Sequence, residues 1–344
     1  MLTVLSVGYS LAPVGPDAVG GSEQVLTAID RALVEAGHRS LVVACEGSVA
    51  AGELLPVPAP PPGPVDDGVR AAAQVAMRDV LGGALGRADL VHLHGFDFHA
   101  YLPPPGPPAL VTLHLPPDWY PAGALSPSRP ATWFNCVSRS EERSCPPGTR
   151  LLPAIGNGVP VEALGAVRLA CRGHALMLGR VCPEKGQHLA LQAARAADVP
   201  LLLGGEVFPY PEHQAYFEHE VRPLLDSRRR FLGPLGFVRK RRMLASARCV
   251  LVPSLAAETS SLVSMEALAC GTPVIAFRSG ALPEIVEHGR TGFLVDDVDG
   301  MAAAIARIPE IDRETCRRTA AERFSQRRMT DAYLALYRRL AACA

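Results

Sequence analysis

Two carboxylates flank a segment in which a strand, a loop and a helix follow one another. Residues 249–252 are an apolar run typical of a buried strand. Ser260 and Ser261 are residue types that cap the N-terminus of a helix. Glu258 therefore lies in the loop before the predicted helix, and Glu266 lies on the helix itself.

The start of this helix is suited to an anion. The first amides of a helix have no partner within it, so those of Ser261, Leu262 and Val263 could hold a phosphate, and Gly271 with Pro273 would end the helix. Carboxylates aimed at a phosphate would repel it, so we expect them to accept hydrogen bonds from hydroxyls attached to it. A nucleotide sugar carries hydroxyls on both sides of its diphosphate. On spacing alone, the pair fits equally well a loop glutamate and a helix glutamate with no shared role.

A second candidate loop carries two cations. Arg180 and Lys185 bracket a predicted strand-to-helix connection after the strand 175–178. A guanidinium and an ammonium that converge there would suit a diphosphate whose negative charge increases as a sugar leaves it. Taken alone, the two residues also fit a surface arginine and a lysine at the start of a helix.

Four histidines lie close together in the first half of the sequence. His92, His94 and His114 lie at or just after the ends of predicted strands, where ligands bind in open parallel sheets, and His99 follows in the next loop. No further ligands at tetrahedral spacing accompany them, so a metal site is not favoured. We expect His92 and His94 to be hydrogen-bonded in the core or at its edge, and His114 to bond a sugar hydroxyl or to line a reaction centre.

Another acidic pair resembles a cation motif but has a simpler explanation. Asp297 and Asp299 match the short motif with which some transferases bind a divalent cation. They follow the last strand of the second half, so a helix-entry turn is the preferred interpretation. We predict no metal site.

The elements that would position these residues form two α/β series. The first begins with a strand at residues 2–7, a loop from Gly8 to Gly20, a helix from Gly21 to about 36 and a strand at 41–44. Gly20 and Gly21 lack a Cβ and precede a helix, which is a geometry that approaches phosphate, although the dinucleotide motif G-x-G-x-x-G is absent. The proline-rich residues 55–65 are predicted to be a loop.

The second series begins near residue 175 and ends with three helices at about 301–308, 313–324 and 327–342. Two α/β halves of similar size place a cleft between them. A length of 344 residues with 48% hydrophobic and 20% charged residues fits about two globular domains.

Charge excludes an overall attraction to nucleic acid, since the formal net charge is zero. Residues 1–160 hold 9 Arg against 14 Asp plus Glu, so the first half is acidic and the second is basic and better suited to an anionic ligand. The basic runs 228–230 and 239–242 could form a lipid or nucleic-acid patch, but solvated helix ends are the preferred interpretation. Lysine occurs only at positions 185 and 240, which we attribute to coding bias.

Cysteine usage and hydropathy indicate a cytoplasmic protein. The nine cysteines are odd in number and include no C-x-x-C pair, so neither a disulfide framework nor a zinc site is expected. The N-terminus lacks the features of a signal peptide, and no apolar run reaches membrane-spanning length. Attachment to a membrane surface is compatible with this composition but nothing indicates it, and no oligomeric state is indicated.

Several runs together resemble the retaining glycosyltransferase family 4, which has the GT-B fold of two Rossmann-like domains facing across a cleft. The C-terminal runs that carry the resemblance are residues 179–186, 258–266, 269–277 and 283–297, and looser matches occur at 20–23, 36–38, 91–95 and 156–158. The resemblance implies an acceptor-side domain at 1–160, a nucleotide-sugar-binding domain at 161–325, and a final helix at 326–344 that crosses back to the first domain. Its buried stripe would be Met329, Ala332, Tyr333, Leu336, Tyr337 and Leu340.

The resemblance also implies a role for each candidate residue. Glu266 would bind the ribose and Glu258 the donor hexose. Arg180 and Lys185 would hold the diphosphate. The remaining implied donor contacts are the helix start at Ser261, Leu262 and Val263, the loop Gly20 and Gly21, His114 beside the transferred sugar, and Pro234, Leu235 and Gly236 near the base.

One departure from the family pattern affects the sugar end. The family commonly has an aromatic residue and a glycine after the first glutamate, where this chain has Ser260 and Ser261. A Cβ at the usual glycine changes the close approach of the backbone, so the identity of the donor sugar is not transferred.

The sequence therefore predicts a metal-independent, retaining hexosyltransferase in bacterial glycan or natural-product glycosylation. Its co-substrate would be a nucleotide diphosphate sugar, with a UDP- or GDP-sugar expected. The acceptor would be a small molecule, a glycan or a lipid-linked hydroxyl, and nucleic acid is not a partner. The alternatives are a GT-B epimerase or phosphorylase, and a catalytically weak nucleotide-sugar-binding partner subunit.

Overall fold

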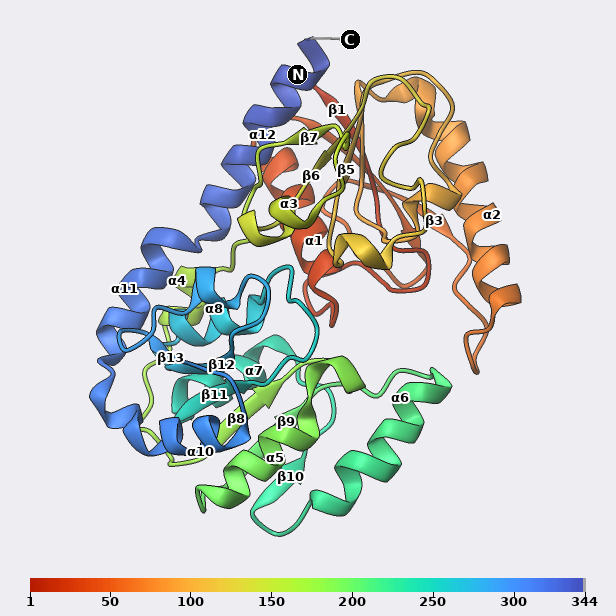
Figure 1. The fold of residues 1–344 in the computed structure, drawn as a ribbon. Helices are drawn as coiled ribbons and strands as arrows, with labels where there is room; N and C mark the ends of the chain where they lie inside the picture. Colours follow the sequence, from red (N-terminus) through yellow and green to blue (C-terminus); the bar gives the residue numbers. More distant parts are fainter. Residues whose placement is uncertain (343–344) are drawn as a thin grey trace. The chain divides into compact units, whose positions relative to one another are not determined.

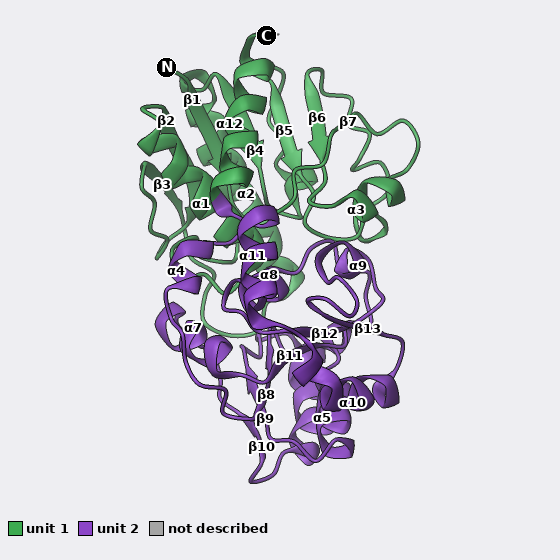
Figure 2. Cartoon of the chain, turned by 90° about the vertical axis from the view of Figure 1, so that its left-hand side faces the viewer, with its two compact units in different colours: residues 1–157, 327–344 green, residues 158–326 purple. Residues whose placement is uncertain are grey.

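The chain is divided into two compact units. The computed structural model describes residues 1–342. Unit 1 comprises Met1–Asn157 with Arg327–Ala344, and unit 2 comprises Gly158–Gln326 (Figure 2). Each unit is a parallel sheet with helices packed against it, which confirms the predicted fold class of two Rossmann-like α/β domains.

Unit 1 is built on a seven-stranded parallel sheet with the order β3-β2-β1-β4-β5-β6-β7. Its strands are β1 (Thr3–Val7), β2 (Arg39–Cys45), β3 (Glu53–Val57), β4 (Leu90–Leu93), β5 (Ala109–Thr112), β6 (Thr132–Asn135) and β7 (Leu151–Leu152). The central strands are buried on both faces, as their continuous apolar runs require. The order reverses between β1 and β4, which creates a ligand-binding position at the carboxyl ends of those strands.

The last helix of the chain completes unit 1. The helices of this unit are α1 (Gly21–Glu35), α2 (Asp67–Ala84), α3 (Arg139–Ser144) and α12 (Gln326–Ala342), which lies beside α1 and β1 in Figure 1. The buried stripe of α12 consists of Met329, Thr330, Tyr333, Leu334, Leu336, Tyr337 and Leu340, whereas Ala332 is half-buried. This stripe shares an apolar cluster with Val4 and Ile29, so the predicted return of the final helix to the first domain is confirmed.

The prediction of a loop throughout residues 55–65 is wrong at its start. β3 pairs with β2 in parallel, with Pro56 opposite Ala44 and Val57 opposite Cys45. β3 is the edge strand of the sheet, so no neighbouring strand on its outer side needs the N–H group that Pro56 lacks.

Unit 2 is built on a six-stranded parallel sheet with the order β10-β9-β8-β11-β12-β13. Its strands are β8 (Ala175–Leu178), β9 (Leu201–Gly204), β10 (Arg229–Phe231), β11 (Cys249–Val252), β12 (Val274–Phe277) and β13 (Gly292–Val295). Its helices are α4 (Val161–Gly165), α5 (Gln187–Ala196), α6 (Pro211–Tyr216), α7 (Phe237–Ser246), α8 (Leu262–Ala269), α9 (Leu282–Ile285), α10 (Val298–Arg307) and α11 (Arg313–Arg323). Asp297 caps α10 by accepting a hydrogen bond from Gly300 N at 2.7 Å, so the helix-entry interpretation of this acidic pair is confirmed.

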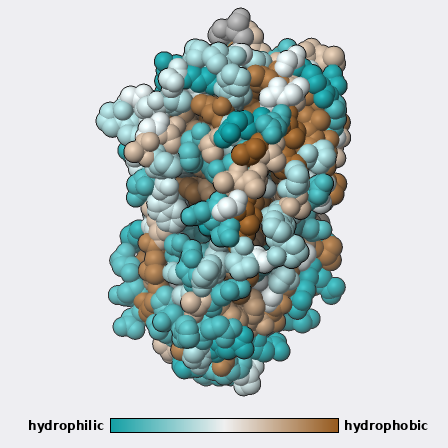
Figure 3. Space-filling model, turned by 90° about the vertical axis from the view of Figure 1, so that its right-hand side faces the viewer, coloured by the Kyte–Doolittle hydropathy of each residue, from teal (hydrophilic) through white to brown (hydrophobic). Residues whose placement is uncertain are grey.

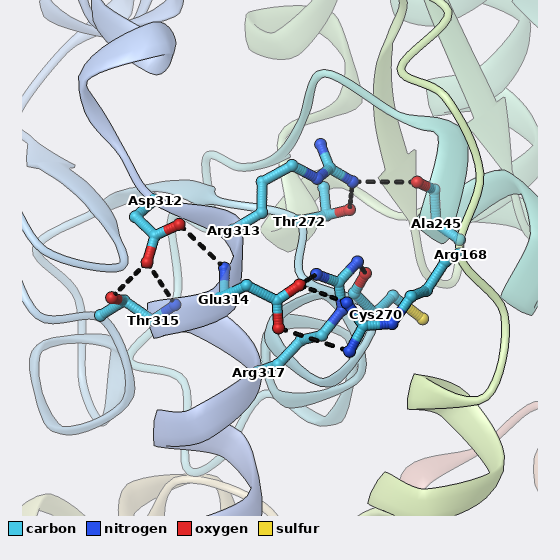
Figure 4. A network of polar contacts seen from close by, with 9 residues as sticks. All are labelled: Arg168, Ala245, Cys270, Thr272, Asp312, Arg313, Glu314, Thr315 and Arg317. Atoms are coloured by element: carbon cyan, nitrogen blue, oxygen red, sulfur yellow. Dashed lines mark hydrogen bonds and ion pairs between the residues drawn. The ribbon is translucent and has the colours of Figure 1, made fainter.

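Guanidinium groups of α11 hold the C-terminal ends of α7 and α8 (Figure 4). Arg317 donates to the carbonyl of Cys270 at 3.0 Å, and Arg313 donates to Thr272 Oγ1 at 2.8 Å and to the carbonyl of Ala245 at 2.9 Å. These contacts satisfy carbonyls that a helix end leaves without partners, and they place positive charge where the helix dipole is negative. The network therefore anchors α8, the helix that begins next to Glu258.

One basic run was interpreted wrongly from sequence. Arg229 begins strand β10 and pairs with Asp226 at 2.7 Å, and only 11% of its side chain is exposed. Arg228 pairs with Asp198. The run 228–230 therefore belongs to a sheet edge with specific carboxylate partners rather than to a solvated helix end.

No helix among residues 1–342 has the length and apolar character needed to cross a membrane. Large apolar side chains that are exposed lie apart in the sequence, and the face in Figure 3 alternates hydrophilic and hydrophobic areas. The eight cysteines of the described residues are all free thiols.

Candidate active site

The candidate residues of unit 2 gather where its strand order reverses. β8 and β11 are neighbours at this reversal, and ligands of open α/β sheets bind at the carboxyl ends of such strands. Arg180 and Lys185 follow β8, and Glu258 follows β11. The topology therefore brings together two loops that lie far apart in the sequence.

Backbone contacts lock these two loops to each other. Leu255 N donates to the carbonyl of Glu184 at 2.8 Å, and Ser254 Oγ donates to the same carbonyl at 3.2 Å. Gly186 has φ of +69°, and a Cβ there would lie 2.4 Å from the carbonyl oxygen of Pro253. Glycine is therefore required at position 186 by both its conformation and its close backbone neighbour.

Lys185 and Glu258 form a partly buried ion pair at this junction. Lys185 Nζ lies 2.6 Å from Glu258 Oε1, with exposed side-chain fractions of 31% and 8%. The backbone of Glu258 is held from the other side, because Ala281 N donates to its carbonyl at 2.7 Å. The pair uses one carboxylate oxygen, so Oε2 of Glu258 remains available to a hydroxyl.

Glu266 has a cationic partner that the sequence interpretation missed. Lys240 Nζ lies 2.5 Å from Glu266 Oε1, with exposed fractions of 17% and 5%. Lys240 lies in the first turn of α7, and its place in the basic run 239–242 predicts a solvated helix end. That assignment is wrong for Lys240, and the available signal was its identity as one of only two lysines in the chain.

The N-terminus of α8 has the geometry predicted for an anion site. Ser261 caps the helix by accepting a hydrogen bond from Ser264 N at 3.4 Å. Within residues 1–342, the amides of Leu262 and Val263 have no hydrogen-bond acceptor. The buried hydroxyl of Ser260 has no partner in the same described range. Two free amides thus lie on the segment that connects Glu258 and Glu266.

Arg180 lies at the end of β8 near a small group of potential metal ligands. Its carbonyl accepts a hydrogen bond from Gln187 Nε2 at 2.6 Å, which anchors the backbone of this residue to α5. Cys182, Glu184 and His213 each offer a ligand atom, all within 4.8 Å of one another. Burial is the largest influence on both pKa values: it lowers the pKa of His213, whereas it raises that of Glu184 and is outweighed there by hydrogen bonds from the backbone of Glu184 and from Cys182. The positive charge of Arg180 lowers both pKa values further. The same charge opposes binding of a metal cation by these side chains.

The predicted base loop is shaped by close backbone contacts at the strand ends. Gly205 N donates to the carbonyl of Gly233 at 2.9 Å, and a Cβ on Gly205 would lie 1.8 Å from the carbonyl oxygen of Gly179. The segment Pro234, Leu235 and Gly236 then leads directly into α7. The predicted base loop is therefore followed directly by the helix that carries Lys240, the partner of Glu266.

His114 of unit 1 takes part in a chain of hydrogen bonds between histidine side chains. His94 Nδ1 lies 3.2 Å from His114 Nε2, and His94 Nε2 lies 3.1 Å from His92 Nδ1. His92 also contacts Tyr337 OH and Thr112 Oγ1, each at 2.6 Å. The hydrogen-bonded core role predicted for His92 and His94 is confirmed, since their ring nitrogens are engaged by protein groups.

Burial keeps these imidazoles neutral. It lowers the pKa of His114 to about 4, and it lowers the pKa values of His92 and His94 well below the usual range for histidine. A neutral His114 can donate or accept a hydrogen bond through a ring nitrogen. Its predicted contact with a transferred sugar stays a prediction.

The predicted phosphate loop of unit 1 already holds a carboxylate. Gly20 precedes α1 without a side-chain cap, and a Cβ on Gly20 would lie 1.8 Å from Glu23 Oε2. Ser22 Oγ donates to Glu23 Oε1 at 3.0 Å. For a phosphate to reach the amides of Gly20 and Gly21, the buried carboxylate of Glu23 must turn away.

Family profiles match both halves of the sequence. The profile described as Glycosyltransferase Family 4 matches residues 19–140, and the profile described as Glycosyl transferases group 1 matches residues 172–310. The chain belongs to the family 4 type of glycosyltransferases. The second match spans Arg180, Lys185, Lys240 and both glutamates, so the candidate site of unit 2 lies within the shared region.

Curated relatives cover part of this glycosyltransferase. A D-inositol 3-phosphate glycosyltransferase of Saccharomonospora viridis is 36% identical over 210 residues, which are 56% of this chain and 46% of the relative. The enzyme of the same description from Mycolicibacterium paratuberculosis is 33% identical over 206 residues, which are 56% of this chain and 44% of the relative. The chain thus spans about half the length of the curated relatives it matches.

Solved structures extend the likeness to the whole chain. A glycosyltransferase involved in avilamycin A biosynthesis is 26% identical, with a TM-score of 0.76 over 100% of this chain and 99% of that one. Sucrose-phosphate synthase from Thermosynechococcus elongatus gives a TM-score of 0.80 at 20% identity, with both chains fully covered. An Anabaena protein solved with UDP-glucose gives a TM-score of 0.73 at 19% identity, over 98% of this chain and 99% of that one. The last two likenesses concern the fold.

Proposed function

We propose that this glycosyltransferase moves a hexosyl group from a nucleotide diphosphate sugar to an acceptor hydroxyl. The observation that carries the proposal is the arrangement around α8. Two buried glutamates, Glu258 and Glu266, flank free helix amides, and each is bound to a lysine through one oxygen only. Hydroxyl acceptors on either side of an anion site match the two sugars on either side of a diphosphate.

Each end of the donor has a proposed partner in unit 2. Glu266 accepts hydrogen bonds from the ribose hydroxyls, and Glu258 accepts them from the hexose. The diphosphate lies between them, bound by Arg180, Lys185 and the amides of Leu262 and Val263. The segment Pro234, Leu235 and Gly236 borders the base.

The proposed reaction retains the configuration of the transferred sugar. The acceptor hydroxyl attacks the anomeric carbon from the face that the diphosphate leaves. A bond forms between the acceptor oxygen and the anomeric carbon, the bond to the diphosphate oxygen breaks, and the departing phosphate takes the proton. Arg180 and Lys185 stabilise the charge that grows on this leaving group, which is a task that a divalent cation performs in other transferases. We therefore propose that no metal ion is needed.

A ligand screen followed by product analysis tests the proposal. UDP-, GDP- and ADP-sugars are compared by thermal shift, with UDP-glucose first because the Anabaena structure contains it. A ligand present at 100 times its Kd stabilises the native state by about 2.7 kcal/mol. The stabilising donor is then supplied with simple hydroxyl acceptors, and the anomeric configuration of the product is read by NMR with and without EDTA.

The outcomes separate the parts of the proposal. A glycoside with the donor's anomeric configuration, formed equally in EDTA, supports all of it. An inverted product contradicts retention, and loss of turnover in EDTA contradicts metal independence. If no nucleotide sugar raises the melting temperature, the assignment of unit 2 as a donor site is wrong.

A further inference from the structure

Lysine is rare in this protein, and both of its lysines lie at the candidate site. The sequence contains 34 basic lysine and arginine residues, of which only Lys185 and Lys240 are lysines. Lys185 binds Glu258, and Lys240 binds Glu266. Arginine serves in ion pairs elsewhere in the described chain, whereas both site glutamates pair with lysine.

Arginine and lysine side chains differ in how many oxygens of a carboxylate they engage. A guanidinium is a planar fork that commonly binds both oxygens of a carboxylate, whereas an ammonium is a compact point charge. Lys240 Nζ contacts Glu266 Oε1, and within residues 1–342 the other oxygen of Glu266 has no partner. That oxygen is not among the fully buried atoms without a partner, so it keeps some exposure to solvent.

The position of Lys240 links two parts of the proposed donor site. Lys240 N donates to the carbonyl of Gly236 at 2.9 Å, so the lysine lies one helical turn after the loop assigned to the base. Its ammonium reaches across to Glu266 on α8, the carboxylate assigned to the ribose. With 17% of its side chain exposed, Lys240 is largely shielded from water, which strengthens its hold on the carboxylate.

We propose that Lys240 is a positioning residue that makes the donor site selective for a ribonucleotide. It holds Glu266 by one oxygen and leaves the other to accept the ribose hydroxyls. This inference rests on the proposed function. A donor that lacks the 2′-hydroxyl leaves the second carboxylate oxygen of Glu266 short of a hydrogen bond, and the site binds that donor less well for this reason.

The test compares a ribonucleotide donor with its 2′-deoxyribose counterpart, using the base identified by the ligand screen. For the wild-type chain, we expect kcat/KM to favour the ribose donor by about 10- to 100-fold, the range for one hydrogen bond to a charged group. In Lys240→Ala this preference shrinks towards unity, KM for the ribose donor rises about 10-fold, and kcat changes little. Lys240→Arg keeps the charge but occupies both oxygens, so it loses the preference as well.

Arg239→Ala is the matched control. It removes one positive charge from the same turn of α7, and Arg239 is exposed. A general electrostatic effect on an anionic donor would appear equally in both variants, whereas the proposed role affects only Lys240. Melting temperatures are measured for all variants, and Lys240→Gln is used if Lys240→Ala loses its native transition.

Two results would overturn the inference in different ways. If the wild-type chain transfers sugar and Lys240→Ala or Lys240→Gln keeps the wild-type preference for ribose, Lys240 does not position Glu266. If the wild-type chain binds no nucleotide diphosphate at all, the proposed function fails, and the role of Lys240 fails with it.

Discussion

Lys185 Nζ lies 2.6 Å from Glu258 Oε1 although the two residues are 73 positions apart in the sequence. The contact brings a cation of the β8 loop to a carboxylate of the β11 loop, beside the free amides of α8. Because a leaving diphosphate gains charge, a fixed ammonium at this place would stabilise the transition state more than the bound substrate.

Substitution Lys185→Ala should therefore lower kcat by about 100- to 1,000-fold, the range for removing one preorganised charge-stabilising group. The fold should persist, because Lys185 is 31% exposed and its surroundings are held by backbone contacts. Initial rates and a thermal melt check both statements. Near-wild-type turnover in a folded variant would rule out the role.

The two glutamates should be separable by ligand. Glu266→Gln should weaken binding of both the free nucleoside diphosphate and the nucleotide sugar by about 10-fold, since both contain the ribose. Glu258→Gln should weaken only the nucleotide sugar. Isothermal titration of both ligands against both variants measures the difference, and an equal loss of nucleoside diphosphate affinity in the two variants would contradict the assignment of sugar and ribose ends.

Adjacent serines should respond oppositely to removal of the hydroxyl. Ser261→Ala deletes the cap of α8 and should cost about 1 kcal/mol of the free energy of unfolding of unit 2. Ser260→Ala removes a buried hydroxyl that has no partner in the described chain, so it should be neutral or stabilising. Urea unfolding of the two variants makes the comparison, in which a larger loss for Ser260→Ala would show that its hydroxyl has a partner after all.

Acid should destabilise unit 1 through its buried histidines. The folded pKa of His114 is about 4, below the value of 6.5 for an unperturbed histidine, so the unfolded chain binds more protons between these values. Stability is present above pH 6.5 and is lost as the pH falls towards 4. His114→Asn should reduce the slope of stability against pH in this window, whereas His99→Gln, which changes an exposed histidine, should not. Identical slopes in wild type and His114→Asn would contradict the lowered pKa of His114.

Much of the fold could be predicted from the sequence, because the signals for its elements are local. The apolar run of β11, the cap at Ser261 and the 3.6-residue stripe of α12 each depend on neighbours within a few positions. The edge strand at Pro56 was missed because proline is excluded from the interior of a sheet, and only the strand order shows that β3 has a free edge.

The chemical types at the site could be predicted too, but not all of their partners. The sequence identifies four candidate residues, because charged side chains close to strand ends and to the start of a helix are well placed to bind a ligand. They are Glu258, Glu266, Arg180 and Lys185. Local sequence predicts a solvated Lys240, since nothing near it in sequence indicates a carboxylate on α8. His92, His94 and His114 were identified singly, and their hydrogen-bonded chain to Tyr337 depends on the return of α12 to the first sheet.

The sequence by itself determined the two α/β halves, the capped helix and the residues that we propose to bind a diphosphate and its flanking hydroxyls. The tertiary structure decided which cation meets which carboxylate, that Glu23 folds back over Gly20, and that each site glutamate meets its lysine through one oxygen, Oε1. The physical reason is the distance along the sequence over which each kind of interaction acts. Caps and apolar periodicity act over one or two turns, whereas an ion pair forms only after the crossover connections of a parallel sheet have brought distant loops to the same edge.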